Sequence, residues 1–218
     1  ILGVEKALLT TSCTDALEMC ALLLDFKEGD EFIVPSFTFV STVNALIGQG
    51  AIPKYADIDE DTLSISLDTI KPLVNTKTKA IVLVHYGGNA KNLGQIVEFC
   101  RERKIHLIED NAHGFLGKSN GQPLGTFGSL STLSFHETKN LNCGEGGALV
   151  INDPSLINRA EIIREKGTDR SLFFRGEVDK YTWRDRGSSF LPSEINAAFL
   201  SCQLEAVEEI QSRRKHIY

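Results

Sequence analysis

Short apolar segments alternate with longer amphipathic ones along nearly the whole chain, and this alternation restricts the possible folds more than any other feature. The apolar segments have the length of β-strands, and the segments between them have the apolar spacing of helices. Short strands that alternate with helices predict a mostly parallel sheet with helices packed on both faces. The sequence therefore predicts an α/β fold of three layers, helix–sheet–helix.

The boundaries of the expected elements follow from the apolar segments and from the turn residues between them. Strands are expected at 31–34, 52–56, 80–85, 106–109, 130–135 and 148–151. Helices are expected at 15–24, 41–48, 67–74, 93–103, 155–166 and 193–216. Residues 167–191 are rich in arginine and glycine and weakly periodic, so they are predicted to form a long functional loop.

Composition and charge exclude several classes of function. Hydrophobic residues make up 42% of the chain and charged residues 24%, which is ordinary for a soluble globular protein. The net charge of −6, without a basic stripe, argues against nucleic acid as a partner. Neither a bilayer-spanning apolar run nor a signal peptide is visible, so no membrane partner is expected. The five scattered cysteines lack metal-binding spacing, which predicts reduced thiols, no metal site and a cytoplasmic location.

The ends of the sequence suggest a piece of a longer chain. The first residue is Ile1 rather than methionine, and residues 213–218 stop inside a helical pattern without a capping residue. The 218 residues suffice for one large domain with a substantial core. We therefore expect a single large domain over residues 1–218, truncated at both ends.

Polar residues follow several of the predicted strands. They occupy 36–39, 85–86, 110–113 and 134–139. Ligands of parallel α/β sheets bind outside the carboxyl ends of the strands, so these segments are predicted to converge on one crevice.

Lys139 and Asp110 are the most informative residues of this crevice. Lys139 stands in a polar turn followed by the glycine cluster 144–147; its simplest interpretation is a solvated surface lysine. Asp110 ends an apolar strand, where aspartate often serves only as a turn residue. Together they offer an amine that can form an imine and an acid that can hold a pyridinium nitrogen. This pair is the minimum that pyridoxal phosphate chemistry requires.

Other residues of the crevice allow two interpretations each. Ser12, Cys13 and Thr14 open a helix, where their side chains can cap the helix and its first amides can hold a phosphate. Ser134 could add a further phosphate contact. Phe39 is either a core residue or an aromatic that stacks on a flat cofactor ring.

The histidines and the arginines of the long loop are more ambiguous. His113 is either a buried, hydrogen-bonded residue or a partner of the cofactor's phenolic oxygen, whereas His136 and His85 could simply pack or cap. The loop arginines either lie in solvent or grip a phosphorylated substrate or a partner subunit. These arginines are Arg170, Arg175, Arg184 and Arg186.

Four segments together resemble the DegT/StrS family of nucleotide-sugar aminotransferases, which are fold-type I pyridoxal phosphate enzymes. They are Thr-Ser-Cys-Thr (11–14), Pro-Ser-Phe-Thr-Phe-Val-Ser-Thr (35–42), Glu-Asp-Asn-Ala-His (109–113) and Ser-Phe-His-Glu-Thr-Lys-Asn (134–140). Residues 164–185 are similar to the branch that makes dTDP-4-amino-4,6-dideoxygalactose. The resemblance implies the large domain of an aspartate aminotransferase-like fold, without the C-terminal small domain.

The resemblance also implies a role for each site residue. Lys139 matches the Schiff-base lysine, Asp110 the partner of the pyridine nitrogen, and Phe39 the aromatic that stacks on the ring. His113 matches a position beside the ring. The remaining cofactor-binding positions are Ser12, Cys13, Thr14, Ser134 and His136. Ser189 stands near the place where relatives carry an asparagine that reaches the phosphate of the other subunit.

The activity implied by the resemblance is transfer of an amino group, with glutamate as donor, to the 4-keto group of a dTDP-4-keto-6-deoxyhexose. A homodimer with shared active sites is implied as well, with residues 167–191 crossing between subunits. One alternative is a sugar dehydratase of the same family, although those enzymes carry histidine in place of the lysine. The other alternative is a non-catalytic relative of the fold.

Overall fold

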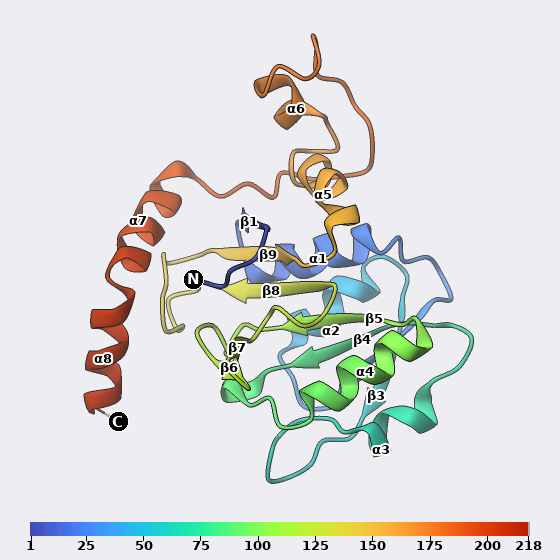
Figure 1. Cartoon of the computed structure of the whole chain (residues 1–218). Helices are drawn as coiled ribbons and strands as arrows, with labels where there is room; N and C mark the ends of the chain where they lie inside the picture. Colours follow the sequence, from blue (N-terminus) through green and yellow to red (C-terminus); the bar gives the residue numbers. More distant parts are fainter. Residues whose placement is uncertain (218) are drawn as a thin grey trace.

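A seven-stranded sheet lies at the centre of the computed structural model, which describes residues 1–217 (Figure 1). The strand order is β1-β9-β8-β5-β4-β2-β3. Among these strands β9 alone runs in the direction opposite to the other six, so the prediction of a mostly parallel sheet is confirmed. The strands are β1 (Lys6–Thr10), β2 (Glu31–Pro35), β3 (Ile52–Ala56), β4 (Thr78–Val84), β5 (His106–Asp110), β8 (Leu130–Ser134) and β9 (Gly147–Ile151).

Helices cover both faces of this sheet, as the alternation of the sequence predicts. They are α1 (Cys13–Leu23), α2 (Val40–Ile47), α3 (Leu67–Ile70), α4 (Leu93–Arg103), α5 (Ile157–Arg164), α6 (Arg170–Phe174), α7 (Glu194–Glu205) and α8 (Val207–Ile217). Short 3₁₀ turns lie at η1 (Lys71–Leu73), η2 (Tyr86–Gly88) and η3 (Pro154–Leu156), and a small hairpin joins β6 (Lys118–Ser119) to β7 (Gln122–Pro123).

Alternate side chains of the central strands enter different core layers. Phe32 and Val34 of β2 join the layer formed with α1, α2 and α5, whereas Ile33 joins the layer formed with α3 and α4. This alternation is the period of a strand whose two faces are both buried. A third cluster, which includes Leu200 of α7, packs against β8 and β9. The molecule therefore has the expected three layers.

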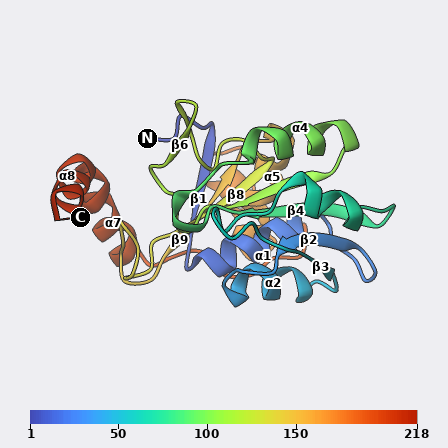
Figure 2. The same cartoon turned by 90° about the horizontal axis from the view of Figure 1, so that it is seen from below.

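The structure corrects the predicted elements at four places. The helix expected at 193–216 is interrupted at Ala206, which leaves the helical conformation (φ −92°, ψ 12°), and the resulting α7 and α8 lie to one side of the sheet (Figure 2). The helix expected at 67–74 becomes 3₁₀ after Ile70, where Pro72 follows. Residues 6–10 form a strand that the sequence analysis missed, because only Leu8 and Thr10 are buried. The predicted loop 167–191 contains the short helix α6.

Within residues 1–217 no helix combines the length and the apolar character needed to cross a membrane.

Candidate functional site

A cavity of about 570 Å³ lies at the carboxyl ends of β4, β5 and β8, which contribute Val84, Asp110 and Ser134 to its wall. This is the edge at which ligands bind to parallel α/β sheets, and the volume is in the range of small-molecule sites. The other side chains come from the start of α1, from the segment before α2 and its first turn, and from the segments that follow β4, β5 and β8. They are Ser12, Cys13, Thr14, Phe37, Phe39, Ser41, Thr42, Tyr86, His113, His136, Thr138, Lys139 and Glu145.

Asp110 is the last residue of β5, and its carboxylate lies in the wall of the cavity with only 5% of the residue exposed. Oδ2 accepts a 2.8 Å hydrogen bond from the hydroxyl of Thr42, and Oδ1 accepts one of 3.2 Å from the amide of Ala112. Its carbonyl accepts the amide of His85 at 3.0 Å. A carboxylate has about four acceptor positions, so Asp110 retains the capacity to accept from a ligand in the cavity.

Lys139 lies in a turn whose backbone is closed on itself. Phe135 donates its amide to the carbonyl of Gly146, and Glu137 donates to Gly144, each at 2.8 Å. Gly144 has φ +81°, a conformation that glycine adopts without strain. The amide of Lys139 bonds to the carbonyl of His136 at 2.9 Å, and the half-buried side chain lines the cavity. The turn thus holds an amine opposite the acid at the end of β5.

The start of α1 forms a potential anion site in the same cavity. Ser12 caps the helix by accepting the amide of Asp15 at 3.0 Å, which leaves the amides of the first helical residues without intrahelical acceptors. The hydroxyl of Thr14 donates to Oγ of Ser41 at 2.9 Å, so Ser41 keeps its own hydrogen for another acceptor. Such helix ends attract phosphate through their amides and their partial positive charge.

Gly147 brings β9 close to this helix start. A Cβ atom built on Gly147 would lie 2.3 Å from the carbonyl carbon of Ser12 and 2.4 Å from the amide nitrogen of Cys13. A larger residue at this position would therefore displace the potential anion site.

Aromatic side chains form one wall of the cavity. Phe39 is 72% exposed, which is unusual for a large apolar residue and leaves a ring face available to a ligand. Tyr86 contacts Phe37 on one side and His113 on the other, with ring centroids 4.9 and 5.1 Å apart. A planar group in the cavity would meet these faces.

Two titratable groups of the cavity have displaced pKa values. Burial, followed by the positive charge of Lys139, lowers the pKa of His113 and outweighs the opposing effect of Asp110. Burial and then the charge of Asp110 raise the pKa of the Cys13 thiol far above its usual range. His113 is therefore mainly neutral at pH 7, and Cys13 remains a thiol.

All of the predicted site residues except Ser189 line this one cavity. Ser189 does not line it and instead forms an antiparallel bridge with Glu165, and a contact with another subunit's site stays a prediction. His85 does not face the cavity, contrary to the expectation for its segment. It points to the other face of the sheet, because strand residues alternate and its neighbour Val84 lines the cavity.

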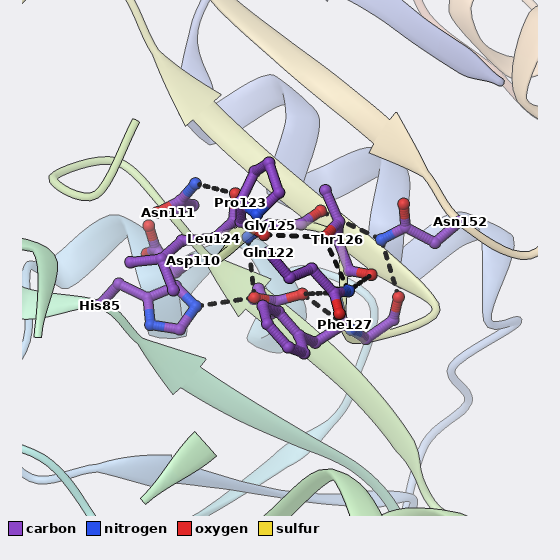
Figure 3. A network of polar contacts seen from close by, with 12 residues as sticks. His85, Asp110, Asn111, Gln122, Pro123, Leu124, Gly125, Thr126, Phe127 and Asn152 are labelled. Atoms are coloured by element: carbon purple, nitrogen blue, oxygen red, sulfur yellow. Dashed lines mark hydrogen bonds and ion pairs between the residues drawn. The ribbon is translucent and has the colours of Figure 1, made fainter. Parts of the chain in front are cut away.

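His85 belongs to a buried polar network behind the cavity (Figure 3). Its Nε2 lies 2.7 Å from Oε2 of Glu109. The same carboxylate accepts the amides of Gly125, Phe127 and Gly128 at 2.7 to 2.9 Å. The network ties the 122–128 loop to the strand that ends in Asp110.

The arginines of the predicted loop make ion pairs within the chain. Arg184 pairs with Asp169, Arg170 with Glu165, and Arg175 with both Glu161 and Glu177. None of the four loop arginines lines the cavity. Within this chain Arg170, Arg175 and Arg184 therefore brace the segment after α5, whereas Arg186 pairs with Asp25. A grip on substrate or on a partner subunit stays a prediction.

Thr42 and Glu145 line the cavity but were not predicted to do so. Tyr86 belongs to a polar segment that was expected at the crevice, so its place was indicated but its stacking was not. Glu145 comes close to His136, with 3.6 Å between its Oε1 and Nε2. Thr42 lies one helical turn after Thr38, whose hydroxyl is 2.8 Å from its own, and this spacing was a signal that could have been used.

Comparison with known proteins agrees with this architecture. The sequence model of the DegT/DnrJ/EryC1/StrS aminotransferase family matches residues 1–218. A GDP-perosamine synthase from Escherichia coli O157:H7 is 37% identical over 98% of the chain and 57% of its own length. A dTDP-4-dehydro-2,3,6-trideoxy-D-glucose 4-aminotransferase from Saccharopolyspora spinosa is 35% identical over the same shares.

A solved structure is also similar throughout. The aminotransferase TlmJ from Streptoalloteichus hindustanus superposes with a TM-score of 0.89 at 33% identity, covering 98% of this chain and 57% of that one. The chain thus spans 57% of the length of each of these relatives.

Proposed function

Since the chain belongs to the DegT/DnrJ/EryC1/StrS aminotransferase family, we propose that it is the cofactor-binding part of an enzyme that aminates a nucleotide-linked keto sugar. In the specific form of the proposal, L-glutamate donates the amino group and the 4-keto group of a dTDP-4-keto-6-deoxyhexose accepts it. The observation that carries the proposal is that the amine of Lys139 and the carboxylate of Asp110 line the same cavity.

Pyridoxal phosphate is the cofactor of this family, and its ring supplies an electron-accepting system that stabilises negative charge at the Cα of an amino acid. The donors and acceptors of the cavity fit this group. Asp110 has acceptor capacity for a pyridinium nitrogen, the start of α1 has amides for a phosphate, and Phe39 offers an exposed ring face.

In this proposal each cavity residue holds a particular part of the cofactor. Nζ of Lys139 would hold the cofactor, and the carboxylate of Asp110 would accept a hydrogen bond from its pyridine nitrogen and so favour the protonated ring. The amides of Cys13 and Thr14, together with the hydroxyls of Ser12 and Ser134, hold the phosphate. His113 and His136 flank the ring and the turn that carries the lysine.

Proton transfer is assigned to Lys139. With the cofactor bound, Nζ of Lys139 would accept the proton from Cα of the amino donor and would later give it up again. The half-burial of Lys139 limits the access of water to this atom. Neutral His113 adds no positive charge beside the amine, which suits a lysine that must act as a base.

Space for the substrate adjoins the lysine. A second cavity of about 400 Å³ is lined by Gly87, Phe115 and Asn140 and shares His113, Ser134, Thr138 and Lys139 with the first. We assign the acceptor sugar to this side. The two similar relatives differ in the nucleotide of the sugar for which they are named: one is GDP and the other dTDP. We assign dTDP to this chain because of the resemblance of residues 164–185 described above.

The remaining parts of the proposal concern the whole protein. Residues 1–218 form the large domain, and a small domain completes the substrate pocket. The enzyme is a cytoplasmic homodimer, in which residues 167–191 cross to the partner and Ser189 reaches its phosphate.

Mass spectrometry after borohydride reduction tests the cofactor site first. Reduction should leave a phosphopyridoxyl group on the peptide that contains Lys139, and Lys139→Ala should lose it. An adduct only on other lysines would contradict the assignment.

The substrate is then tested by supplying L-glutamate with either dTDP- or GDP-4-keto-6-deoxyhexose. A 4-amino sugar from the dTDP substrate supports the specific proposal, amination of the GDP sugar alone would reject the nucleotide, and a 3-deoxy product would indicate the dehydratase.

A further inference from the structure

We infer that Thr42 is a positioning residue for Asp110: its hydroxyl holds the carboxylate in the orientation that faces the cofactor's ring nitrogen. The inference rests on the proposed function, because it takes Asp110 as the partner of that nitrogen. It implies that a residue of α2, as well as the end of β5, helps to hold the ring nitrogen.

The contact between the two side chains is short and shielded from water. Oγ1 of Thr42 lies 2.8 Å from Oδ2 of Asp110. Thr42 is 1% exposed and Asp110 is 5% exposed. A hydrogen bond to a charged group in such surroundings is stronger than one between neutral groups, and its loss leaves a buried charge less well satisfied.

The direction of this hydrogen bond follows from the chemistry of the groups. An ionised carboxylate only accepts, so Thr42 must donate to it. The acceptor side of the Thr42 hydroxyl then faces Oγ1 of Thr38, 2.8 Å away, which can donate in turn. The two threonines form a chain of hydroxyls that ends on the carboxylate and fixes its orientation.

The backbone around Thr42 fixes the direction in which its hydroxyl points. Thr42 lies in the first turn of α2, with its backbone amide bonded to the carbonyl of Phe39 at 3.1 Å. As a β-branched residue in a helix it has few rotamers available. The helix that presents Phe39 to the ring therefore also fixes the orientation of the acid.

Two variants of Thr42 distinguish the effect of its hydroxyl from that of its methyl group, and a third variant at another residue is the control. Thr42→Val keeps the shape and removes the donor, Thr42→Ser keeps the donor, and Thr62→Val is the matched control. The Thr62 hydroxyl is buried, has no hydrogen-bond partner within residues 1–217 and does not line the cavity. Pyridoxal phosphate is titrated into each apoprotein, and the dissociation constant and the pH dependence of the bound cofactor's visible absorbance are measured.

We expect Thr42→Val to raise the dissociation constant roughly 10-fold or more, as the loss of a hydrogen bond to a charged group implies. It should also move the pH at which the absorbance of the bound cofactor changes. Thr42→Ser should remain within about threefold of the wild type, since it keeps the charge-assisted bond. Thr62→Val should bind like the wild type. Circular dichroism confirms that each variant is folded.

The inference is overturned if folded Thr42→Val binds and titrates like the wild type, or if Thr42→Ser is as impaired as the valine variant. Should Thr42→Val fail to fold, the serine variant and Thr38→Val, which removes the outer hydroxyl, decide the question by the same titration. Wild-type protein that does not bind the cofactor at all would reject the proposed function and this inference together. Normal wild-type binding with an unaffected valine variant rejects the inference alone.

Discussion

Nε2 of His85 lies 2.7 Å from Oε2 of Glu109, and neither side chain is exposed to solvent. Glu109 precedes Asp110 on β5, so the two carboxylates point to opposite faces of the sheet. One face carries the cavity, and the other carries a buried histidine–carboxylate hydrogen bond, whose carboxylate also accepts three backbone amides. The pair thus anchors the strand end on which the cavity's acid is mounted.

Glu109→Gln should destabilise the protein by about 1–3 kcal/mol, the cost of leaving buried hydrogen-bonding groups unsatisfied. The amide group would also place a donor against backbone amides that now donate to the carboxylate. The free energy of unfolding in urea at pH 7 measures this effect. Glu98→Gln is the matched control, because Glu98 makes an exposed pair with Arg101. Equal stability of Glu109→Gln and the wild type would contradict the prediction.

The same variant should alter the dependence of stability on pH. Burial opposes ionisation of Glu109, but the hydrogen bonds from His85, Gly128 and Phe127 outweigh it and lower its pKa. The stabilisation by this carboxylate is therefore complete above the unfolded value near 4.3 and is lost as the pH falls through the lower folded value. The difference between wild type and Glu109→Gln should shrink below about pH 4. A difference that stays constant down to pH 2 would argue against this assignment.

Gly147→Ala should impair the potential anion site without touching any of its polar groups. The added Cβ would lie 2.3 Å from the backbone of Ser12, so the start of α1 must move. Overpacking of this kind costs about 1–3 kcal/mol. Thermal unfolding and the dissociation constant of pyridoxal phosphate should both worsen. Gly48→Ala is the control, since its Cβ would make ordinary contacts of 3.5 Å in a helical conformation (φ −56°); equal behaviour of the two variants would refute the steric argument.

Most of the fold could be predicted because burial and periodicity coincide in the central strands. Every residue of β2, β8 and β9 is buried, and the apolar residues that dominate β2 and β9 are recognisable in the sequence. The edge strand β1 was missed because it buries only alternate residues, which is a weak signal in five positions. The interruption at Ala206 carries no glycine or proline, so the sequence offered no sign of it.

The site could be predicted as a set of residues but not as a network. Lys139 and Asp110 were found because their chemistry is specific and each follows an apolar strand. Thr42 was missed because a threonine near the start of a helix has many structural roles, and only the fold shows that its hydroxyl meets Asp110.

The five cysteines should differ widely in their reaction with iodoacetamide at pH 8. Cys202 is exposed on α7 and should be alkylated first. Burial raises the pKa of Cys100 to about 12, and burial and Asp110 raise the pKa of Cys13, so both remain unreactive thiols. Peptide mass spectrometry over time gives the order. Because Cys13 lines an open cavity, alkylation as rapid as that of Cys202 would show that its thiol ionises readily and would contradict the prediction.

The pKa of His113 should respond in opposite directions to changes in its two charged neighbours. Burial and Lys139 lower it, whereas Asp110 raises it. Lys139→Met should therefore move it upward, toward the ordinary value near 6.5, and Asp110→Asn should move it further down. Titration of the histidine ring protons by NMR in the cofactor-free protein measures both. His106 is an internal control, because burial lowers its pKa far from the cavity, and it should titrate alike in all three proteins. If neither substitution changed the pKa of His113, the two charges could not be the neighbours that shift it, and the prediction would be wrong.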